Sequence, residues 1–187
     1  MESSLKDRLM SFIVHNLGQD VLLALDENIR NAYEQAHDDA KKLININPTR
    51  MRAQNRRYYV DNAVAGIHAS VEAEICSTEP KGEMYVVLKS GKITLSHIEL
   101  HKDIPARDAK HRKFLAKKNA ILEKPQYDLF KKPPPELDDA LHIVIVVVHP
   151  EKTNINQSKP LSVLVTVPYT TWDGYHLDVS LAYMLQK

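Results

Sequence analysis

The sequence predicts an α+β fold, in which a helical N-terminal half is followed by a mostly antiparallel mixed sheet. Three observations predict it. Apolar residues recur at helical spacing through the first part of the chain, short β-branched runs replace them afterwards, and one further helical stretch interrupts those runs. The expected order is three helices, three strands, a helix that crosses between strands, and three more strands.

Helical periodicity defines three segments in the N-terminal half. The first begins near Leu5 and ends at Gly18, a residue type that commonly ends helices. The second runs from Gln19 to Leu43 with an apolar seam on one face. Thr49 is the expected N-cap of the third helix, over residues 50–73.

The pattern then changes to that of strands. We expect strands at Glu74 to Thr78, Met84 to Leu88 and Ile93 to Leu100, with Ser90-Gly91 as the turn of a hairpin between the last two. A helix follows at about Ala106 to Glu123. Its expected buried stripe is Phe114, Leu115, Ile121 and Leu122.

The clearest strand is Leu141 to His149, which follows a proline-rich loop at 124–139. Its run of β-branched residues does not alternate, which predicts a central strand covered on both faces, with Ile143, Val144, Ile145, Val146 and Val147 buried. Leu161 to Thr171 is the next expected strand. The Asp173-Gly174 turn then predicts that Tyr175 to Leu185 returns as its partner, although a C-terminal helix is an alternative.

Two units are expected along the chain. Residues 1–48 form a helical arm that is a candidate dimerisation surface, and residues 49–187 form the α+β domain. Cys76 is the single cysteine, which excludes an intrachain disulfide and cysteine-based metal fingers. Apolar runs are too short to span a membrane and no secretory leader is visible, so a cytoplasmic protein is expected. Glycine-rich nucleotide loops are missing, and no cofactor is expected.

Positive charge gathers in two short segments, although the net charge of the chain is only +1. Residues 49–60 carry a net charge of +4 and residues 105–124 carry +5, whereas the rest carries −8. Arginine and lysine contact phosphates, asparagine reaches base edges, and tyrosine stacks on bases. The expected nucleic-acid contacts are Arg50, Arg52, Asn55, Arg56, Arg57, Tyr59, Lys110, Lys113 and Lys117.

Three residues at the end of the third expected strand are of types that bind metal ions. His97, Glu99 and His101 alternate along a strand and therefore face the same way. Two imidazoles and a carboxylate are ligands that zinc accepts. Alternate residues lie about 7 Å apart along a strand, too far for the three to meet on one ion, so no metal site is expected here.

A second pattern lies in the second helix. Arg30 and His37 are seven residues apart and share a helix face, and Asn31 follows the arginine. This resembles the Arg-x(4–6)-His motif of HEPN ribonucleases. The resemblance implies an all-helical fold and phosphodiester cleavage by Arg30 and His37, whereas the second half of this chain has the pattern of a sheet.

The order of elements is itself similar to a nuclease core. Helix, three strands, helix and strand is the core order of PD-(D/E)xK nucleases, which hold a divalent metal with an acidic residue on the second strand and an acid-x-Lys on the third. Glu83 opens the second strand here. Glu99 and His101 stand where acid-x-Lys is expected, and the lysine is missing.

These patterns lead to one functional expectation and two alternatives. We expect a nucleic-acid-binding protein from a phage, mobile-element, toxin–antitoxin or antiviral-defence setting, without deciding between DNA and RNA. The first alternative is a nuclease of HEPN-like or degenerate PD-(D/E)xK-like type. The second is an interaction or inhibitor module that binds an acidic protein or a second copy of itself.

Overall fold

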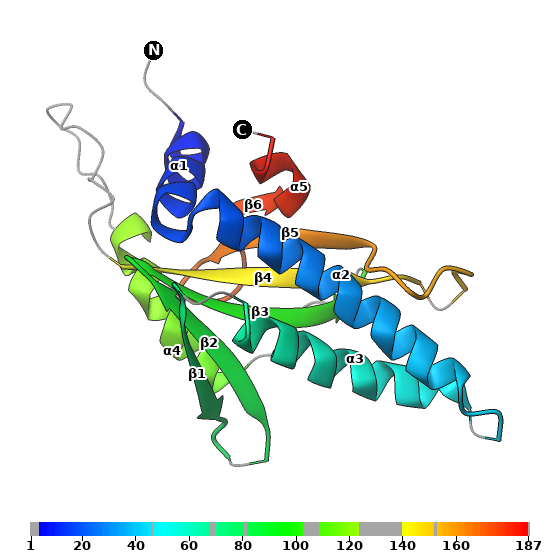
Figure 1. Cartoon of the computed structure of the whole chain (residues 1–187). Coiled ribbons are helices and arrows are strands. Elements are labelled where there is room, and N and C mark those ends of the chain that lie inside the picture. The colour runs from blue at the N-terminus through cyan, green and yellow to red at the C-terminus, as the bar shows by residue number, and fades with distance from the viewer. Residues whose placement is uncertain are drawn as a thin grey trace, which may run out of the picture.

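Helices precede a sheet of six strands, and a further helix lies between the third and fourth strands (Figure 1). The α+β fold and the order of elements expected from the sequence are confirmed. None of the helices in the described part of the chain combines the length and the apolar character that a membrane crossing requires. The computed structural model describes residues 4–45, 47–67, 70–80, 82–102, 109–123, 140–151 and 153–186.

The first two helices have nearly the expected bounds. Helix α1 spans Leu5–Leu17, and the side chain of Ser4 caps its first turn. Helix α2 spans Gln19–Lys41 and packs a continuous buried stripe against the rest of the protein. Gly18 separates the two helices with a φ of 84°, a left-handed conformation that favours glycine.

Helix α3 spans Pro48–Ala65, so the expected start and end were both wrong. Asn47, and not Thr49, is the N-cap, and its side-chain oxygen accepts the Thr49 backbone N–H at 2.9 Å. Proline fits the first helical position because its φ suits a helix and its missing N–H needs no partner there. The helix therefore begins before its basic segment, and Gly66 follows its end.

All six strands belong to one sheet, in the order β1 to β6. Every neighbouring pair is antiparallel except β3 and β4, which are parallel. The mostly antiparallel mixed sheet was thus expected correctly. The strands are β1 (Glu72–Ser77), β2 (Met84–Ser90), β3 (Ile93–His101), β4 (Leu141–His149), β5 (Ser162–Pro168) and β6 (Tyr175–Ser180).

Strand β4 is central and buried on both faces, as predicted. It lies between β3 and β5, and all five residues from Ile143 to Val147 are buried. Ile143 and Ile145 belong to the large cluster that also includes the helices. Val144 and Val146 point to the opposite face and pack with Ile98 in a smaller cluster.

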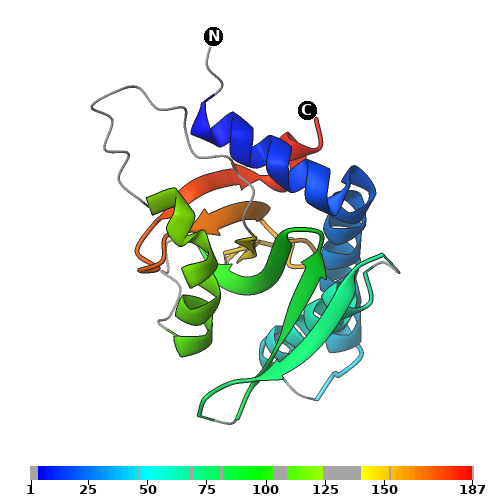
Figure 2. The same ribbon diagram turned by 90° about the vertical axis from the view of Figure 1, so that its left-hand side faces the viewer.

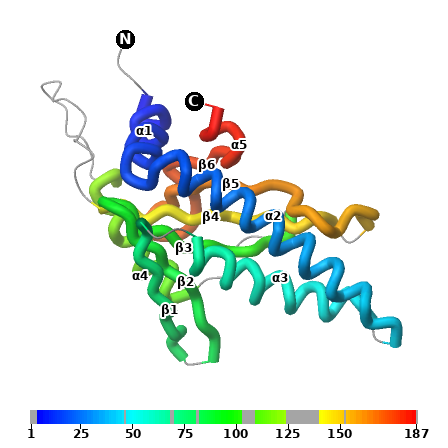
Figure 3. The backbone as a smooth tube through the Cα atoms, in the orientation of Figure 1, coloured from blue at the N-terminus to red at the C-terminus, as the bar shows by residue number. Residues whose placement is uncertain are grey.

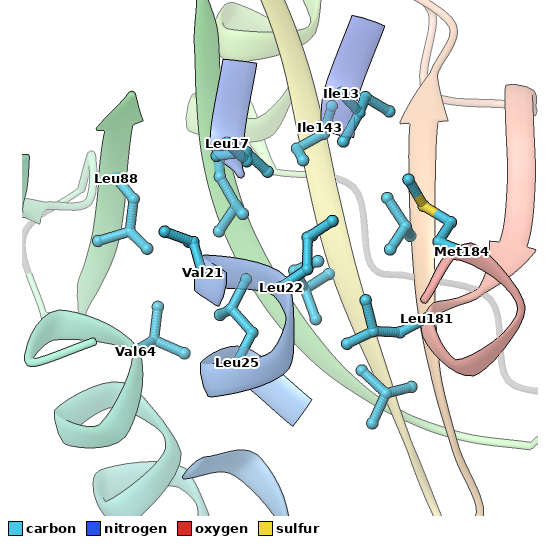
Figure 4. Packing of buried hydrophobic residues seen from close by; sticks show 14 of the residues in the cluster. Ile13, Leu17, Val21, Leu22, Leu25, Val64, Leu88, Ile143, Leu181 and Met184 are labelled. Atoms are coloured by element: carbon cyan, nitrogen blue, oxygen red, sulfur yellow. The ribbon is translucent and has the colours of Figure 1, made fainter. Parts of the chain in front are cut away.

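Helices cover both faces of the sheet. In Figure 2, α2 and α3 lie on one side of the strands, and α4 (Lys110–Ala116) with the short 3₁₀ helix η1 (Lys117–Glu123) lies on the other. Residues of α1 and α2, from the segment predicted as a helical arm, share one buried cluster with the sheet. Figure 4 shows Ile13, Val21 and Leu22 of these helices against Ile143 of β4, beside Leu181 of the short C-terminal helix α5 (Leu181–Met184).

The crossing helix differs from the single α-helix expected over Ala106–Glu123. It changes from α to 3₁₀ geometry after Ala116, and residues 103–108 and the 124–139 loop lie outside the described residues. Phe114 was expected inside but is 68% exposed. Leu115 and Ala116 face the sheet instead, and Phe114 lies about 100° further round the helix.

A buried asparagine attaches η1 to the sheet. Asn119 accepts the backbone N–H of His142 at 2.8 Å and donates to the carbonyl oxygens of His142 and Pro168 at 3.0 and 2.8 Å. Backbone groups of β4 and the end of β5 thereby obtain a partner that no strand supplies. This contact places α4 beside β2 and β3.

The C-terminal hairpin forms, but its turn is longer than Asp173-Gly174 predicted. The Tyr169 N–H donates to the Gly174 carbonyl oxygen at 2.9 Å, and Trp172 rather than glycine adopts a positive φ of 67°. Strand β6 then pairs with β5 and is followed by α5. The strand and helix alternatives for 175–185 therefore each describe part of that segment.

Strands β2 and β3 separate halfway along their length. Their antiparallel register joins Val87–Ser90 to Ile93–Ser96 only, whereas β1 follows β2 from Met84 and β4 follows β3 over all nine residues. The β1–β2 hairpin therefore turns away from the sheet beyond Ser96, as Figure 1 and the tube in Figure 3 show. This separation opens a cavity between β2 and β3.

We expect Ile145→Ala to lower the free energy of unfolding by about 2–4 kcal/mol, because it opens a cavity in a fully buried site. Ile155→Ala is the matched control, since Ile155 is 98% exposed and its loss should change stability by no more than about 0.5 kcal/mol. Urea unfolding measures both. Equal effects in the two variants would contradict the central position of β4.

Candidate functional site

A cavity of about 520 Å³ opens where β2 and β3 part. We call it the α3–α4 cleft, because one wall comes from α3 and the other from the start of α4. Its volume is within the range of about 300–1,000 Å³ typical of small-molecule sites. Its lining residues are Ala53, Arg57, Asp61, Thr78, Glu83, Met84, Tyr85, His97, Ile98, Glu99, Ala109, His111, Arg112 and His149.

Strand alternation places two polar side chains of β3 in this cleft. Glu99 and His97 face α3, and Ile98 between them packs in the opposite cluster. The His97 Nε2 atom lies 2.9 Å from Asp61 Oδ1, so an imidazole of the sheet pairs with a carboxylate of α3. The imidazole lies almost out of solvent, since only 6% of the His97 side chain is exposed, and Asp61 is partly buried.

A second chain of polar contacts leads into the cleft from α2. The Tyr33 hydroxyl lies 2.7 Å from His149 Nδ1, and His149 Nε2 lies 3.7 Å from Glu99 Oε2. Burial raises the pKa of the Tyr33 phenol, so the hydroxyl keeps its proton and donates a hydrogen bond to the imidazole. We infer that Nε2 carries the imidazole proton and faces Glu99.

Burial moves the pKa values of Glu99 and His149 towards the neutral form of each group. It raises the pKa of Glu99 to about 7, and the carboxylate of Asp61 adds to the rise while His97 and Arg56 oppose it. It lowers the pKa of His149 to about 4, with a further contribution from Arg56 and His101. A carboxyl group with a pKa near neutrality exchanges protons readily at physiological pH.

The walls of the cleft carry positive charge from both basic segments. Arg57 of α3 forms an ion pair with Glu83, and both side chains are about half exposed. Arg112 of α4 lines the opposite side. Burial lowers the pKa of Arg112, and the nearby charge of Arg57 lowers it further, so the two guanidinium groups lie within electrostatic reach of each other.

An aromatic pair completes the wall on the α4 side. The rings of Tyr85 and His111 stack with centroids 4.3 Å apart and planes inclined by 23°. Tyr85 points to the face opposite Val86, which packs in the large cluster with α3. The separation of β2 from β3 brings this ring to the cleft.

The predicted nucleic-acid contacts divide into three groups. Arg50, Arg57, Lys110, Lys113 and Lys117 are exposed, and Arg52 and Asn55 are partly buried. Tyr59 donates its hydroxyl to Asp39 at 2.7 Å. Arg56 is buried.

Arg56 corrects the expectation of an exposed phosphate contact, since only 5% of it is accessible. Its guanidinium donates to the carbonyl oxygen and to the side-chain oxygen of Gln157, at 2.7 and 3.1 Å. It also lies over the Tyr33 ring, 4.8 Å from the centroid. Arg56 therefore joins α3 to α2 and to the segment after β4, and it does not reach the surface.

The residues that carry the two nuclease resemblances lie in different parts of the structure. Glu83 and Glu99 line the cleft, and His101 lies beside it with its ring 4.9 Å from that of His149. Arg30 pairs with Asp26 at 2.8 Å on α2, and His37 lies near Lys41 and Arg52. The six-stranded sheet contradicts the all-helical fold that the HEPN resemblance implies.

His97, Glu99 and His101 have separate surroundings, because His97 contacts Asp61 and Glu99 contacts His149. Among the residues that the structure describes, no group of three or more histidine, cysteine, aspartate or glutamate side chains is arranged to hold a metal ion.

Sequence reasoning missed several residues of the cleft. Asp61, Tyr85, His111, Arg112 and His149 carry no motif, and each lies on a different element or at a different turn from its partner. Strand alternation places His142 and His149, seven residues apart, on opposite faces of β4. His142 lies on the other face of β4, 3.3 Å from Ser96, whereas His149 meets Tyr33.

Comparison of the chain with protein-family models, with curated proteins and with solved structures found no match.

Glu99 should make stability depend on pH. Its pKa is raised from 4.5 to about 7 on folding, so its contribution is complete below pH 4.5 and is lost as the pH rises to 7. Glu99→Gln removes this loss. We expect the free energy of unfolding of the variant, relative to the unsubstituted protein, to rise between pH 5 and pH 8 by about 2–3 kcal/mol, as urea unfolding can measure.

The matched control is Glu74→Gln on β1. Glu74 is paired with Lys89 at the surface, and its pKa is lowered rather than raised. A depressed carboxyl pKa changes stability only at lower pH, so the difference between this variant and the unsubstituted protein should stay constant from pH 5 to pH 8. A constant difference for Glu99→Gln as well would contradict the burial of an ionisable Glu99.

Proposed function

We propose that this protein binds nucleic acid through the basic segment of α3, residues 49–60, together with α4 and η1. The observation that carries the proposal is that Arg57 and Arg112, one from each basic segment, line the same cleft. The two segments are far apart in the chain and lie on opposite sides of the sheet, and the fold brings one arginine of each to the same opening. A polyanion that lies across this opening would contact both.

The charge distribution supports a polyanionic partner. The two segments together carry +9 in a chain whose remainder carries −8. Grouped like charges repel each other, and this repulsion is relieved when phosphates neutralise them. The exposed positions of Arg50, Lys110 and Lys117 allow such contacts without movement of the core.

Salt dependence tests this proposal. Arg50→Ala combined with Lys117→Ala removes one exposed charge from each segment. We expect weaker binding to all sequences and a plot of log affinity against log salt concentration that is shallower by about two units, because each phosphate contact contributes about 0.9. Fluorescence anisotropy with labelled DNA and RNA at several salt concentrations gives the slope.

The control is Lys6→Ala combined with Arg8→Ala, which removes the same charges from α1. Its slope should equal that of the unsubstituted protein. No binding to any DNA or RNA at about 50 mM salt would overturn the proposal, because phosphate contacts are strong in that range. The basic surface would then be better explained as a docking face for an acidic protein.

A nuclease acting in the α3–α4 cleft is the second candidate, and one observation favours it. The elements α3, β1, β2, β3, α4 and β4 follow the core order of PD-(D/E)xK nucleases, with Glu83 and Glu99 in one cavity. The residues present do not fit the metal site of that family, because Glu83 pairs with Arg57, Glu99 with His149, and histidine replaces the lysine.

We expect Glu99→Gln to abolish any cleavage of single or double strands, by about 100-fold or more, because loss of a general acid or base has that effect. The assay is run with Mg²⁺, with Mn²⁺ and with a chelator. Glu74→Gln is the control and should keep full activity. Absence of cleavage in the unsubstituted protein under all conditions eliminates this candidate and leaves the binding proposal as it stands.

A further inference from the structure

We propose that the α3–α4 cleft accepts one unpaired nucleotide of a single strand, with its base against Tyr85 and His111 and its phosphate between Arg57 and Arg112. This inference rests on the proposed nucleic-acid binding and adds the class of strand. In this arrangement the basic surface contacts the sugar-phosphate backbone of the nucleic acid, and the cleft binds one base.

The size of the cleft suits one nucleotide and excludes a duplex. A volume of about 520 Å³ admits a ligand of small-molecule size. A base inside a duplex is stacked and paired on both sides, and it reaches a pocket only after extrusion from the helix. An unpaired nucleotide at the end or in the middle of a single strand avoids that loss of stacking and pairing.

The aromatic wall offers a stacking surface. Tyr85 and His111 already stack on each other, and both line the cleft. Burial lowers the pKa of His111, so the ring is neutral and apolar enough to stack on a base. Aromatic stacking tolerates every base, because each base has a π face.

The two arginines provide the phosphate position. Arg57 and Arg112 approach from opposite walls and repel each other. An anion between them would remove that repulsion and accept hydrogen bonds from both guanidinium groups. Glu83 now partners Arg57, but both of these side chains are about half exposed, so a phosphate can take its place.

Two carboxyl groups at the bottom of the cleft, those of Asp61 and Glu99, would contact the hydrogen-bonding edge of the base. Asp61 and Glu99 are less exposed than Arg57, with 27% and 12% of their side chains exposed against 49% for the arginine. Carboxyl groups would repel a phosphate at this depth, but they accept hydrogen bonds from the amino groups of bases. Glu99 exists in both protonation states near neutral pH and can also donate.

The test compares the binding of single-stranded and duplex oligonucleotides to the full chain. Oligonucleotides of about 12 residues, within the usual range of single-strand site sizes, are prepared as single-stranded DNA, single-stranded RNA and duplex. Each carries 2-aminopurine near one end, and its fluorescence reports stacking while anisotropy reports binding. We expect tighter binding of at least one single strand than of the duplex, and a fluorescence change with that strand.

Two variants identify the cleft as the cause. Tyr85→Leu and His111→Ala should each weaken single-strand binding by about tenfold and remove the fluorescence change, in line with the loss of one stacked base. Both should leave duplex binding within about twofold, because phosphate contacts are retained. Tyr58→Leu is the control, since Tyr58 is an exposed tyrosine of α3 outside the cleft.

The outcomes separate this inference from the proposed function. Duplex binding equal to single-strand binding, or single-strand binding unchanged by both variants, would overturn the nucleotide pocket while the basic surface remains. Absence of any nucleic-acid binding by the unsubstituted protein would overturn both the nucleotide pocket and the proposed function. If Tyr85→Leu does not fold, as circular dichroism would show, His111→Ala on the surface helix decides the matter alone.

Discussion

Strand β3 pairs with β4 along its whole length and with β2 along only half of it, and the candidate site depends on this inequality. Backbone groups in a strand need partners, and β4 satisfies one edge of β3 from Ile93 to His101. The β1–β2 hairpin is then free to diverge beyond Ser96. Its divergence opens the sheet between two helices, so residues from both faces of the sheet reach one cavity.

A buried polar network holds the helices in place around this opening. Arg56 binds Gln157 and lies over Tyr33, Tyr33 binds His149, and His149 faces Glu99. Burying ionisable groups is unfavourable unless they have partners, and here burial shifts the pKa of all four groups towards their neutral forms. The network joins α2, α3, β3 and β4, and it supplies the floor of the cleft as a consequence of the way these elements pack.

The opposite wall is set by an independent contact. Asn119 of η1 replaces a strand partner for the backbone of β4 and β5, which fixes α4 next to β2. His111 and Arg112 are presented to the cleft from this position. Two separate anchors, one on each face of the sheet, therefore bring one arginine of each basic segment to the same cleft.

The sequence by itself determined the elements, their order and the burial of β4, because these follow from periodicity within about ten neighbouring residues. It also placed His97 and Glu99 on one face of β3, since alternation is a local property of a strand. Tertiary structure alone decided which arginines of the basic segment on α3 are buried and which are accessible. Arg56 and Arg57 are adjacent and chemically identical, yet one is buried against Gln157 and the other borders the cleft. Their difference, like the meeting of Asp61 with His97 and of Tyr33 with His149, arises from contacts between residues distant in the chain, and no local pattern records such contacts.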